Sequence, residues 1–285
     1  YASLKAVTKF SRGNIPALNA HLVPSEHHLP RELKISKPDV IYYPACLSRT
    51  LADPSQRELS VPQAFTEVLQ AADIKFAYPE KLTDLCCGLR YHSKGYEDAA
   101  MQAAIQTTEM LWISSRGGEL PIVMDTSPCS THLLNYDQFL SGIHLARWRS
   151  LRIMDMVEYL HDEVLEKLSL WQVRDKVVLH PTCSTRRMGI EAKMEAISQR
   201  CAREVIIPLD VGCCAFSGDL GLRLPDLTAI ATQPEAHEVR GINAEGHYST
   251  SRTCEMGLSL ATKKQYQSLI YLVHEAIIRP HDPKN

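Results

Sequence analysis

The chain lacks a long apolar segment, a signal peptide and an excess of charge of either sign. Its longest apolar runs, such as Ile270–Val273 and Val205–Ile207, are far shorter than the roughly 20 residues that a membrane-spanning helix needs. Lys and Arg number 31 against 33 Asp and Glu, so the formal net charge is −2. We therefore expect a cytoplasmic protein, at most peripheral on the inner face of the cell membrane, with no transmembrane segment and no nucleic-acid partner.

The beginning of the chain lacks an initiator methionine. Its first residue is Tyr1, and residues 1–38 mix prolines with polar and histidine-rich sequence. We interpret residues 1–38 as an interdomain linker and the chain as a fragment of a longer protein. The alternative is a mature N-terminus produced by processing.

Cysteine, by contrast, is abundant, and its arrangement repeats. Without a secretory signal, nine cysteines indicate metal or redox chemistry rather than structural disulfides, because a reducing cytosol keeps thiols free. Setting Cys201 aside, the cysteines form two series of single, adjacent pair, single: Cys46, Cys86, Cys87 and Cys129, then Cys183, Cys213, Cys214 and Cys254.

The residues around the cysteines repeat as well. Residues 41–50 read IYYPACLSRT and residues 178–187 read VLHPTCSTRR, each an apolar run followed by Pro, one residue, Cys and a later Arg. Short β-branched runs alternate with helical patterns in both halves, which predicts parallel sheets with crossover helices. We expect an α/β fold of two tandem homologous cysteine-rich units, 39–168 and 169–285, related by pseudo-twofold symmetry.

The expected elements place the cysteines in loops. Open α/β sheets bind ligands just beyond the ends of their strands, and every metal-candidate cysteine follows a predicted strand or lies in a loop. The predicted strands are Val40–Tyr43, Ile74–Ala77, Ile122–Met124, Val177–His180, Val205–Leu209 and Tyr248–Ser251, and the predicted helices include Val61–Ala72 and Tyr96–Ser114.

Four thiolates from three loops can surround a metal ion or an iron–sulfur cluster, because both prefer soft sulfur ligands. Gly88 and Gly212 would let the backbone turn tightly and bring its N–H groups near sulfur. Arg49, Arg186 and Arg252 would offset the negative charge of the thiolates, although an ordinary surface ion pair is the alternative for each.

His132 and Cys201 lie outside the two series of paired cysteines. His132 lies three residues after Cys129, a spacing that could complete a zinc or mixed-ligand site, and a core histidine is the alternative. Cys201 stands alone in the helical stretch Ala192–Ala202, so we exclude it from the site. For all eight paired cysteines, the alternative is a role as small buried apolar residues.

At these residues the sequence resembles the cysteine-rich CCG domain, over about residues 38–279. This family occurs in the B subunit of heterodisulfide reductase, in the glycolate oxidase iron–sulfur subunit, and at the C-terminal end of large FAD-dependent D-lactate dehydrogenases. The segments most similar to the last group are YYPACLSRTL, LCCGL, TSPCS, LHPTCSTRRMG, GCCAFSGDLG, LPDLTAIAT and YSTSRTCEMGLS.

The resemblance implies a role in electron transfer. An FAD module and a ferredoxin-like module would lie upstream in the same polypeptide, and electrons would pass from a 2-hydroxy acid through FAD and iron–sulfur centres to a quinone or cytochrome. His132 and Gly257 stand where the fullest family pattern has second cysteines of a CxxC. We therefore expect four-thiolate binding of an ordinary 4Fe-4S cluster in each half, with zinc as an alternative in one half.

Two other functions remain open at this point. One is a structural zinc module that docks partner subunits, and the other is a thiol or disulfide reductase of the heterodisulfide reductase type, which the absence of a CxxC weakens. Under the leading hypothesis the chain holds no catalytic residue of its own. We then expect it to work as a fragment of an FAD and iron–sulfur oxidoreductase and to be inactive in isolation.

Overall fold

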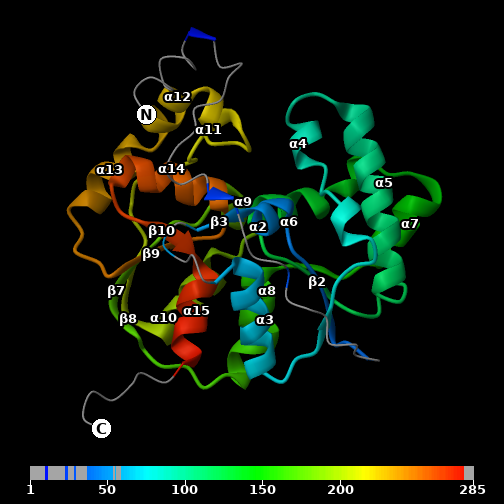
Figure 1. Ribbon diagram of the computed structural model, residues 1–285, viewed down its shortest axis with the longest axis horizontal. Coiled ribbons are helices and arrows are strands. Elements are labelled where there is room, and N and C mark those ends of the chain that lie inside the picture. Colours follow the sequence, from blue (N-terminus) through cyan, green and yellow to red (C-terminus); the bar gives the residue numbers. More distant parts are fainter. Residues whose placement is uncertain are drawn as a thin grey trace.

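The structure is a computed structural model that describes residues 37–53, 55 and 59–278, together with residues 10–11, 23–24 and 29. The linker predicted for residues 1–38 therefore lies almost entirely outside the described residues. The rest of the chain forms two halves, each built around its own sheet (Figure 1). Among the described residues, no helix combines the length and apolar character that a membrane span requires.

The first sheet is wholly parallel and has the spatial order β4-β2-β5-β6. Its central strands β2 and β5 are buried at every residue, so each reads as a continuous apolar run rather than an alternating one. The strands are β2 (Val40–Tyr43), β4 (Phe76–Ala77), β5 (Ile122–Met124) and β6 (Ile153–Asp155).

The second sheet repeats this topology. It is also parallel, with the order β10-β9-β7-β8. Its strands are β7 (Arg174–Leu179), β8 (Ala202–Ile206), β9 (Gly246–Ser249) and β10 (Tyr266–Ser268). In each sheet the first strand along the chain lies between the second and the third, and the fourth lies beside the third. The predicted α/β class with two tandem parallel units is thus confirmed.

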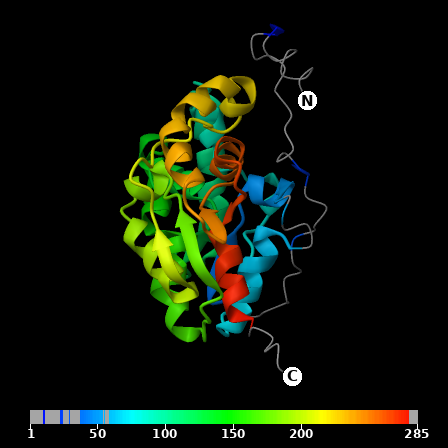
Figure 2. The ribbon, with the colours of Figure 1, turned by 90° about the vertical axis from the view of Figure 1, so that its left-hand side faces the viewer.

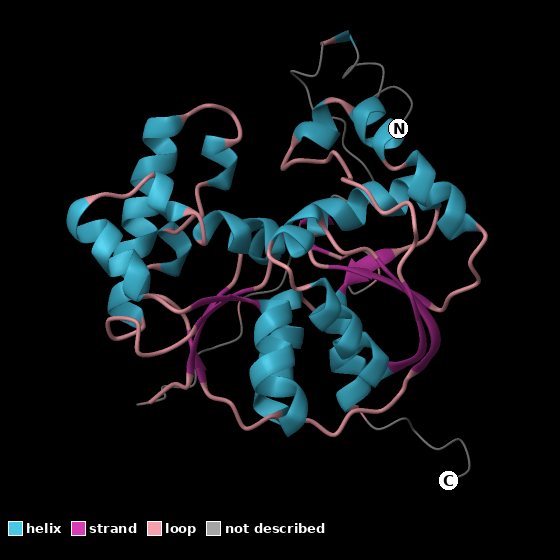
Figure 3. Ribbon diagram, turned by 180° about the vertical axis from the view of Figure 1, so that it is seen from behind, coloured by secondary structure: helices cyan, strands magenta, loops and turns pink. Residues whose placement is uncertain are grey.

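Helices from both halves fill the space between the sheets (Figures 1 and 3). Apolar side chains of α3 and α15, such as Phe65 and Leu272, belong to one core cluster that also contains residues of both sheets. Helix α3 begins at a capping box in which Ser60 and Gln63 satisfy each other's backbone N–H groups. These central helices are α3 (Val61–Ala71), α8 (Met156–Tyr159), α10 (Glu191–Cys201) and α15 (Leu269–Ile277).

Each half also carries further helices and short turns. Figure 2 shows α15 beside α3 at the junction of the halves, as Figure 1 does. The first half carries α4 (Leu89–His92), α5 (Glu97–Ser114), α7 (Gly142–Ser150) and the short turns Leu82–Asp84, Tyr136–Gln138, Leu160–Val164 and Leu165–Lys167. The second half carries α11 (Leu220–Arg223), α12 (Pro225–Ala231), α13 (Gln233–Arg240) and α14 (Arg252–Thr262). A short antiparallel pair joins β1 (Val23–Pro24) to β3 (Leu51–Ala52).

Candidate metal centres

The candidate cysteines of the first half gather at the carboxyl edge of its sheet. Cys46 opens α2 (Cys46–Thr50) directly beyond β2, and Cys129 lies in the first turn of α6 (Ser127–Leu133) beyond β5. The pair Cys86–Cys87 follows β4 and the turn after it. Because the first and third strands are neighbours with crossovers leaving in opposite directions, the crevice between their ends is where such a sheet holds a ligand.

The second half places its cysteines in the same way. Cys183 opens α9 (Cys183–Arg187) beyond β7, Cys254 lies in the first turn of α14 beyond β9, and Cys213–Cys214 follow β8. Helix N-termini present unpaired backbone N–H groups that favour a thiolate over a thiol. The repeat of the cysteines along the chain is therefore a repeat in space.

The four thiols of the first half form a continuous chain of contacts. Cys87 Sγ lies 3.1 Å from Cys129 Sγ, and Cys86 is hydrogen bonded to both Cys46 and Cys87. Those two bonds, with a third from the backbone N–H of Gly88 at 3.5 Å, hold the pKa of Cys86 far below its usual value. Cys86 is thus the thiol of this set that most readily loses its proton.

The second half contains the same chain of contacts. Cys214 Sγ lies 2.9 Å from Cys254 Sγ, and Cys213 is hydrogen bonded to Cys183 and Cys214. These bonds, with one from the N–H of Ala215 at 3.4 Å, lower the pKa of Cys213 far below its usual value. In both halves the first cysteine of the adjacent pair is the thiol with the lowered pKa that also accepts a backbone N–H bond.

Two arginines connect the lone cysteines to the adjacent pairs. Arg49, three residues after Cys46, donates to the carbonyl oxygens of Leu82 at 2.8 Å and Leu85 at 3.0 Å. Arg186, three residues after Cys183, donates to the carbonyl oxygen of Val211 at 2.9 Å. The predicted effect on charge is present at Arg49, which lowers the pKa of Cys86, although its contribution is smaller than those of the hydrogen bonds. Both arginines also hold the loop that carries an adjacent pair.

The tight turn of each pair is made at the residue that follows it. Gly88 has φ +80°, and a Cβ there would lie 3.2 Å from Ala103 Cβ and 3.3 Å from the carbonyl oxygen of Ala100. Ala215 has the matching position and also a positive φ, 51°. Gly212, which we expected to serve the second pair, has no positive φ and open space around its Cα. The N–H that reaches sulfur in the second half belongs to Ala215.

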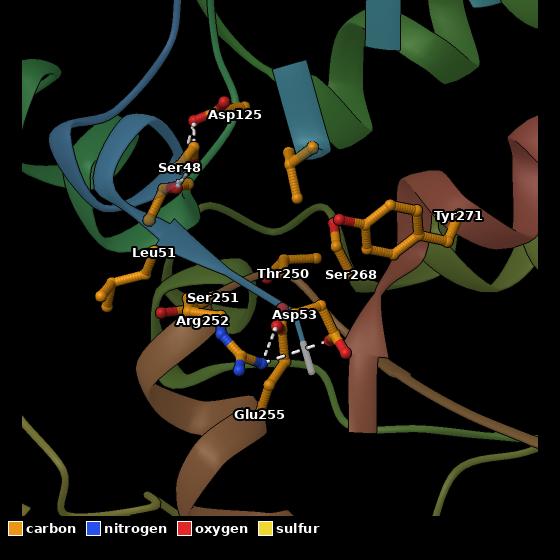
Figure 4. A pocket seen from close by; sticks show the side chains of 12 residues that line it. Ser48, Leu51, Asp53, Asp125, Thr250, Ser251, Arg252, Glu255, Ser268 and Tyr271 are labelled. Carbon is orange, nitrogen blue, oxygen red and sulfur yellow. Dashed lines mark hydrogen bonds and ion pairs between the residues drawn. The ribbon is translucent and has the colours of Figure 1, made fainter. Parts of the chain in front are cut away.

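Arg252 is directed into a polar pocket between the halves (Figure 4). It is buried and forms ion pairs with Asp53 at 3.2 Å and Glu255 at 3.4 Å. Burial raises the pKa of Glu255 to about 8, against the opposing effect of Arg252. The charge of Arg252 is thus matched by the carboxylate of Asp53, with Glu255 as a second acidic partner.

Asp125, in the same pocket, holds the start of α2. Its carboxylate accepts from Tyr42 Oη at 2.6 Å, from the N–H of Ala45 at 2.9 Å and from Ser48 Oγ at 3.0 Å. All of these groups are buried, so each bond replaces one that the group would make to water. Asp125 therefore fixes the backbone on either side of Cys46.

His132 is buried beside the first set of thiols. Its ring stacks on that of His92 with centroids 5.5 Å apart, and its Nε2 has no hydrogen-bond partner. Burial, with a further contribution from His92, lowers its pKa to about 4, so the imidazole is neutral near pH 7. A neutral, unpartnered ring nitrogen near thiols has the chemistry of a metal ligand.

The donor chemistry of both sets fits an iron–sulfur cluster. Each half supplies four soft sulfur donors, one of them with a lowered pKa, and His132 adds an unpartnered nitrogen in the first half. The sulfurs form chains rather than closed cages: in the described part of the molecule, no three His, Cys, Asp or Glu side chains are arranged around a single ion. Zinc would require four ligands to close around one ion at about 2.3 Å from each sulfur.

Cys201 lies apart from both sets. It is the last residue of α10, is fully buried and belongs to the core cluster between the sheets. Burial raises its pKa to about 12, the reverse of the effect on Cys86 and Cys213. Its surroundings are those of a small apolar core residue.

Sequence reasoning missed His180 and Glu235. His180 Nδ1 lies 2.9 Å from both carboxylate oxygens of Glu235, and the ring is also hydrogen bonded to Cys254. Burial lowers the pKa of His180, but these two partners outweigh it and raise the pKa to about 9. The pKa of Cys254 falls to about 6 through its bonds to Cys214 and His180. The one available signal was that His180 stands where Tyr43 stands in the first repeat.

Two known proteins are similar to this chain in sequence. Lactate utilization protein A of Exiguobacterium sp. is 25% identical over 238 residues, which are 80% of this chain and 91% of that protein. The glycolate oxidase iron–sulfur subunit of Escherichia coli is 23% identical over 198 residues, which are 67% of this chain and 48% of that protein, so the chain spans only about half of its length.

Among solved structures, an aspartate racemase homologue from Pyrococcus horikoshii has a TM-score of 0.29 and 10% identity, over 83% of this chain and 96% of that one, and this weak likeness carries no argument. The family model of the cysteine-rich CCG domain matches residues 40–134. The resemblance recognised in the sequence is thereby confirmed for these residues.

Proposed function

We propose that this chain is the iron–sulfur electron-transfer part of an FAD-linked 2-hydroxy-acid dehydrogenase of the D-lactate type. One observation carries the proposal: the same set of four cysteines, each with one pair of contacting sulfurs (Cys87 with Cys129, Cys214 with Cys254), recurs at the carboxyl edge of two sheets with the same strand order. The names of the two relatives, one for lactate utilization and one for the iron–sulfur subunit of glycolate oxidase, support it, because lactate and glycolate are both 2-hydroxy acids.

In this proposal, the four cysteines of each half are the ligands of one 4Fe-4S cluster, which when bound accepts and donates single electrons. The residues of the chain hold and tune the thiolates. The N–H groups of Gly88 and Ala215 donate to sulfur, and Arg49 and Arg186 hold the paired cysteines opposite the lone ones. His132 is an additional candidate ligand in the first half, and zinc is the alternative metal for one half.

The electron donor and acceptor lie outside this chain. An FAD module and a ferredoxin-like module of the same polypeptide would supply electrons from the hydroxy acid, and a quinone or cytochrome would receive them. The chain itself would contribute no catalytic residue. The whole assembly would work in the cytoplasm or at the inner face of the cell membrane.

A second candidate is a thiol or disulfide reductase of the heterodisulfide reductase type. The observation that favours it is the lowered pKa of Cys213, an exposed thiol, because a thiolate is the nucleophile in disulfide exchange. This candidate predicts that the metal-free chain alone reduces a small disulfide. The electron-transfer proposal predicts that it does not.

Metal analysis after anaerobic reconstitution tests the main proposal. We expect brown protein with iron and acid-labile sulfide in both halves, and little zinc. Cys86→Ser and Cys213→Ser should each remove about half of the iron, because each removes a ligand from one set of four. Loss of all the iron after either change would contradict two separate centres, and zinc in place of iron in both halves would support a structural zinc module.

Stopped-flow absorbance tests the electron path. Joined to an FAD module, the chain should support oxidation of D-lactate with an external acceptor. The two cysteine variants should leave the reduction of flavin by substrate unchanged and block reduction of the acceptor. Oxidation of a 2-hydroxy acid by the chain alone, or normal acceptor reduction by the variants, would overturn the proposal.

A further inference from the structure

A buried histidine distinguishes the thiols of the second half from those of the first. His180 is 1% exposed and lies directly after β7, where it contacts both a carboxylate and a thiol. Its Nδ1 is 2.9 Å from both oxygens of Glu235 on α13, itself 2% exposed. The imidazole also interacts with Cys254 on α14, which lowers the pKa of that thiol. Three separate elements therefore converge on one imidazole.

The equivalent position of the first half holds Tyr43. Both residues precede the lone cysteine by three positions and are followed by a proline. The Tyr43 ring is buried near Cys87 and Cys129, but its hydroxyl is hydrogen bonded to Thr107. The nearby His132 contributes no hydrogen bond through its buried Nε2. The two centres thus differ in a group that touches a ligand sulfur.

The chemistry of the partners determines what His180 does. A carboxylate is an acceptor only, and so is a thiolate that is bound to a metal. The imidazole between them must therefore donate towards each, and the bidentate contact with Glu235 fixes the ring in the orientation that faces Cys254. A hydrogen bond to a ligand sulfur stabilises the added electron of a reduced cluster.

We propose that His180 is a positioning residue that donates a hydrogen bond to Cys254 Sγ and makes the second centre more easily reduced than the first. This inference rests on the proposed function, because it requires a cluster in each half. It gives the electron path a direction, since electrons that reach the first centre would pass on to the second. Glu235 supports the effect by holding the imidazole in place.

Reduction potentials of single centres test the proposal. A Cys86→Ser background retains only the second centre, and its potential is measured by anaerobic titration followed by electron paramagnetic resonance. In that background we expect His180→Leu to lower the ratio of reduced to oxidised centre about tenfold at a given applied potential. This change corresponds to a reduction potential that is lower by about 59 mV for a one-electron couple. His180→Gln, which keeps an N–H donor, should restore part of this loss.

Tyr43→Phe in a Cys213→Ser background is the matched control, and it should leave the potential of the first centre unchanged. If His180→Leu does not fold, pulsed resonance of the Cys86→Ser protein labelled with ¹⁵N-histidine decides instead, since a hydrogen-bonded imidazole should give a weak nitrogen coupling. A bound cluster with an unmoved potential, or with no such coupling, would overturn the role of His180. Absence of iron from the unmodified chain would overturn the proposed function instead.

Discussion

Arg49 donates a hydrogen bond from its guanidinium to the carbonyl oxygen of Leu85, the residue directly before Cys86, at 3.0 Å. It makes a second bond, at 2.8 Å, to the carbonyl oxygen of Leu82. A planar fork that spans two carbonyls is a property of arginine and not of lysine. The helix that carries the lone cysteine is thereby tied to the loop that carries the pair.

Substitution of either arginine should weaken metal binding in its own half only. We expect Arg49→Ala to weaken iron retention in the first half by roughly 10- to 100-fold, the range typical of groups that orient metal ligands. Arg186→Ala should do the same in the second half, where the guanidinium holds Val211. Iron remaining during chelator titration is the measurement.

Arg200→Ala is the control, because Arg200 forms an exposed pair with Glu166 and belongs to neither set of four cysteines. It should leave iron retention unchanged. Equal losses in both halves after Arg49→Ala would contradict a local tie, and rescue by Arg49→Lys would show that charge rather than the fork matters.

The residues after the two cysteine pairs should respond to substitution in opposite directions. Gly88→Ala should destabilise the protein by about 1–2 kcal/mol, since a left-handed backbone is costly for residues with a Cβ and the new Cβ would also crowd Ala103. Ala215→Gly removes a Cβ from a backbone with φ 51° and should be neutral or slightly stabilising. Urea unfolding of the metal-free variants measures both, and equal destabilisation would contradict the shared turn.

Cys201→Ser should separate the ninth cysteine from the other eight. We expect its iron content to equal that of the unmodified chain, because Cys201 lies in the core cluster rather than with the thiol sets. Its stability should fall by about 1–3 kcal/mol, since a serine hydroxyl in an apolar site is desolvated. Iron-to-protein ratios and urea unfolding report the two effects, and an iron loss like that of Cys213→Ser would defeat the assignment.

His247 should make stability sensitive to acid. The ring is buried in β9, its Nε2 has no hydrogen-bond partner, and burial, with a smaller effect of Lys264, lowers its pKa from 6.5 to about 4. Between these values the unfolded chain binds a proton that the folded chain does not, so stability is present above pH 6.5 and is lost as pH falls towards 4.

His247→Phe removes the titrating group and keeps a flat ring against Tyr266. The free energy of unfolding of both metal-free proteins should fall between about pH 7 and pH 4.5. The fall should be smaller in the variant, by on the order of 1–2 kcal/mol. Urea unfolding at the two pH values measures the difference. An identical loss in both proteins would show that His247 does not contribute.

The sequence alone determined the class of the fold and the cysteines of interest. The strands predicted at Val40–Tyr43 and Ile122–Met124 coincide with β2 and β5, and the helix predicted at Val61–Ala72 differs from α3 by one residue. Central parallel strands are buried on both faces, so their apolar runs are continuous and easily recognised. The repeated cysteine series is recognised from the positions of the cysteines along the chain.

Short strands at the sheet edges were missed or misplaced. β6 and β10 have three residues each and were not predicted, while β8 begins three residues before the predicted Val205. Pairing with a neighbour decides where such strands begin and end, because too few of their residues are apolar to form a pattern. The boundary between the two units, near residue 168, stays a prediction.

Only the tertiary structure decided which groups meet the thiols. His180 contacts Glu235 across 55 positions of sequence, and Arg252 pairs with Asp53 across 199. Spacing along the chain predicts which residues share a helix or strand, but contacts between elements depend on how the sheets and helices pack. The donors around a ligand sulfur come from several elements, so their identity follows from packing and not from local sequence.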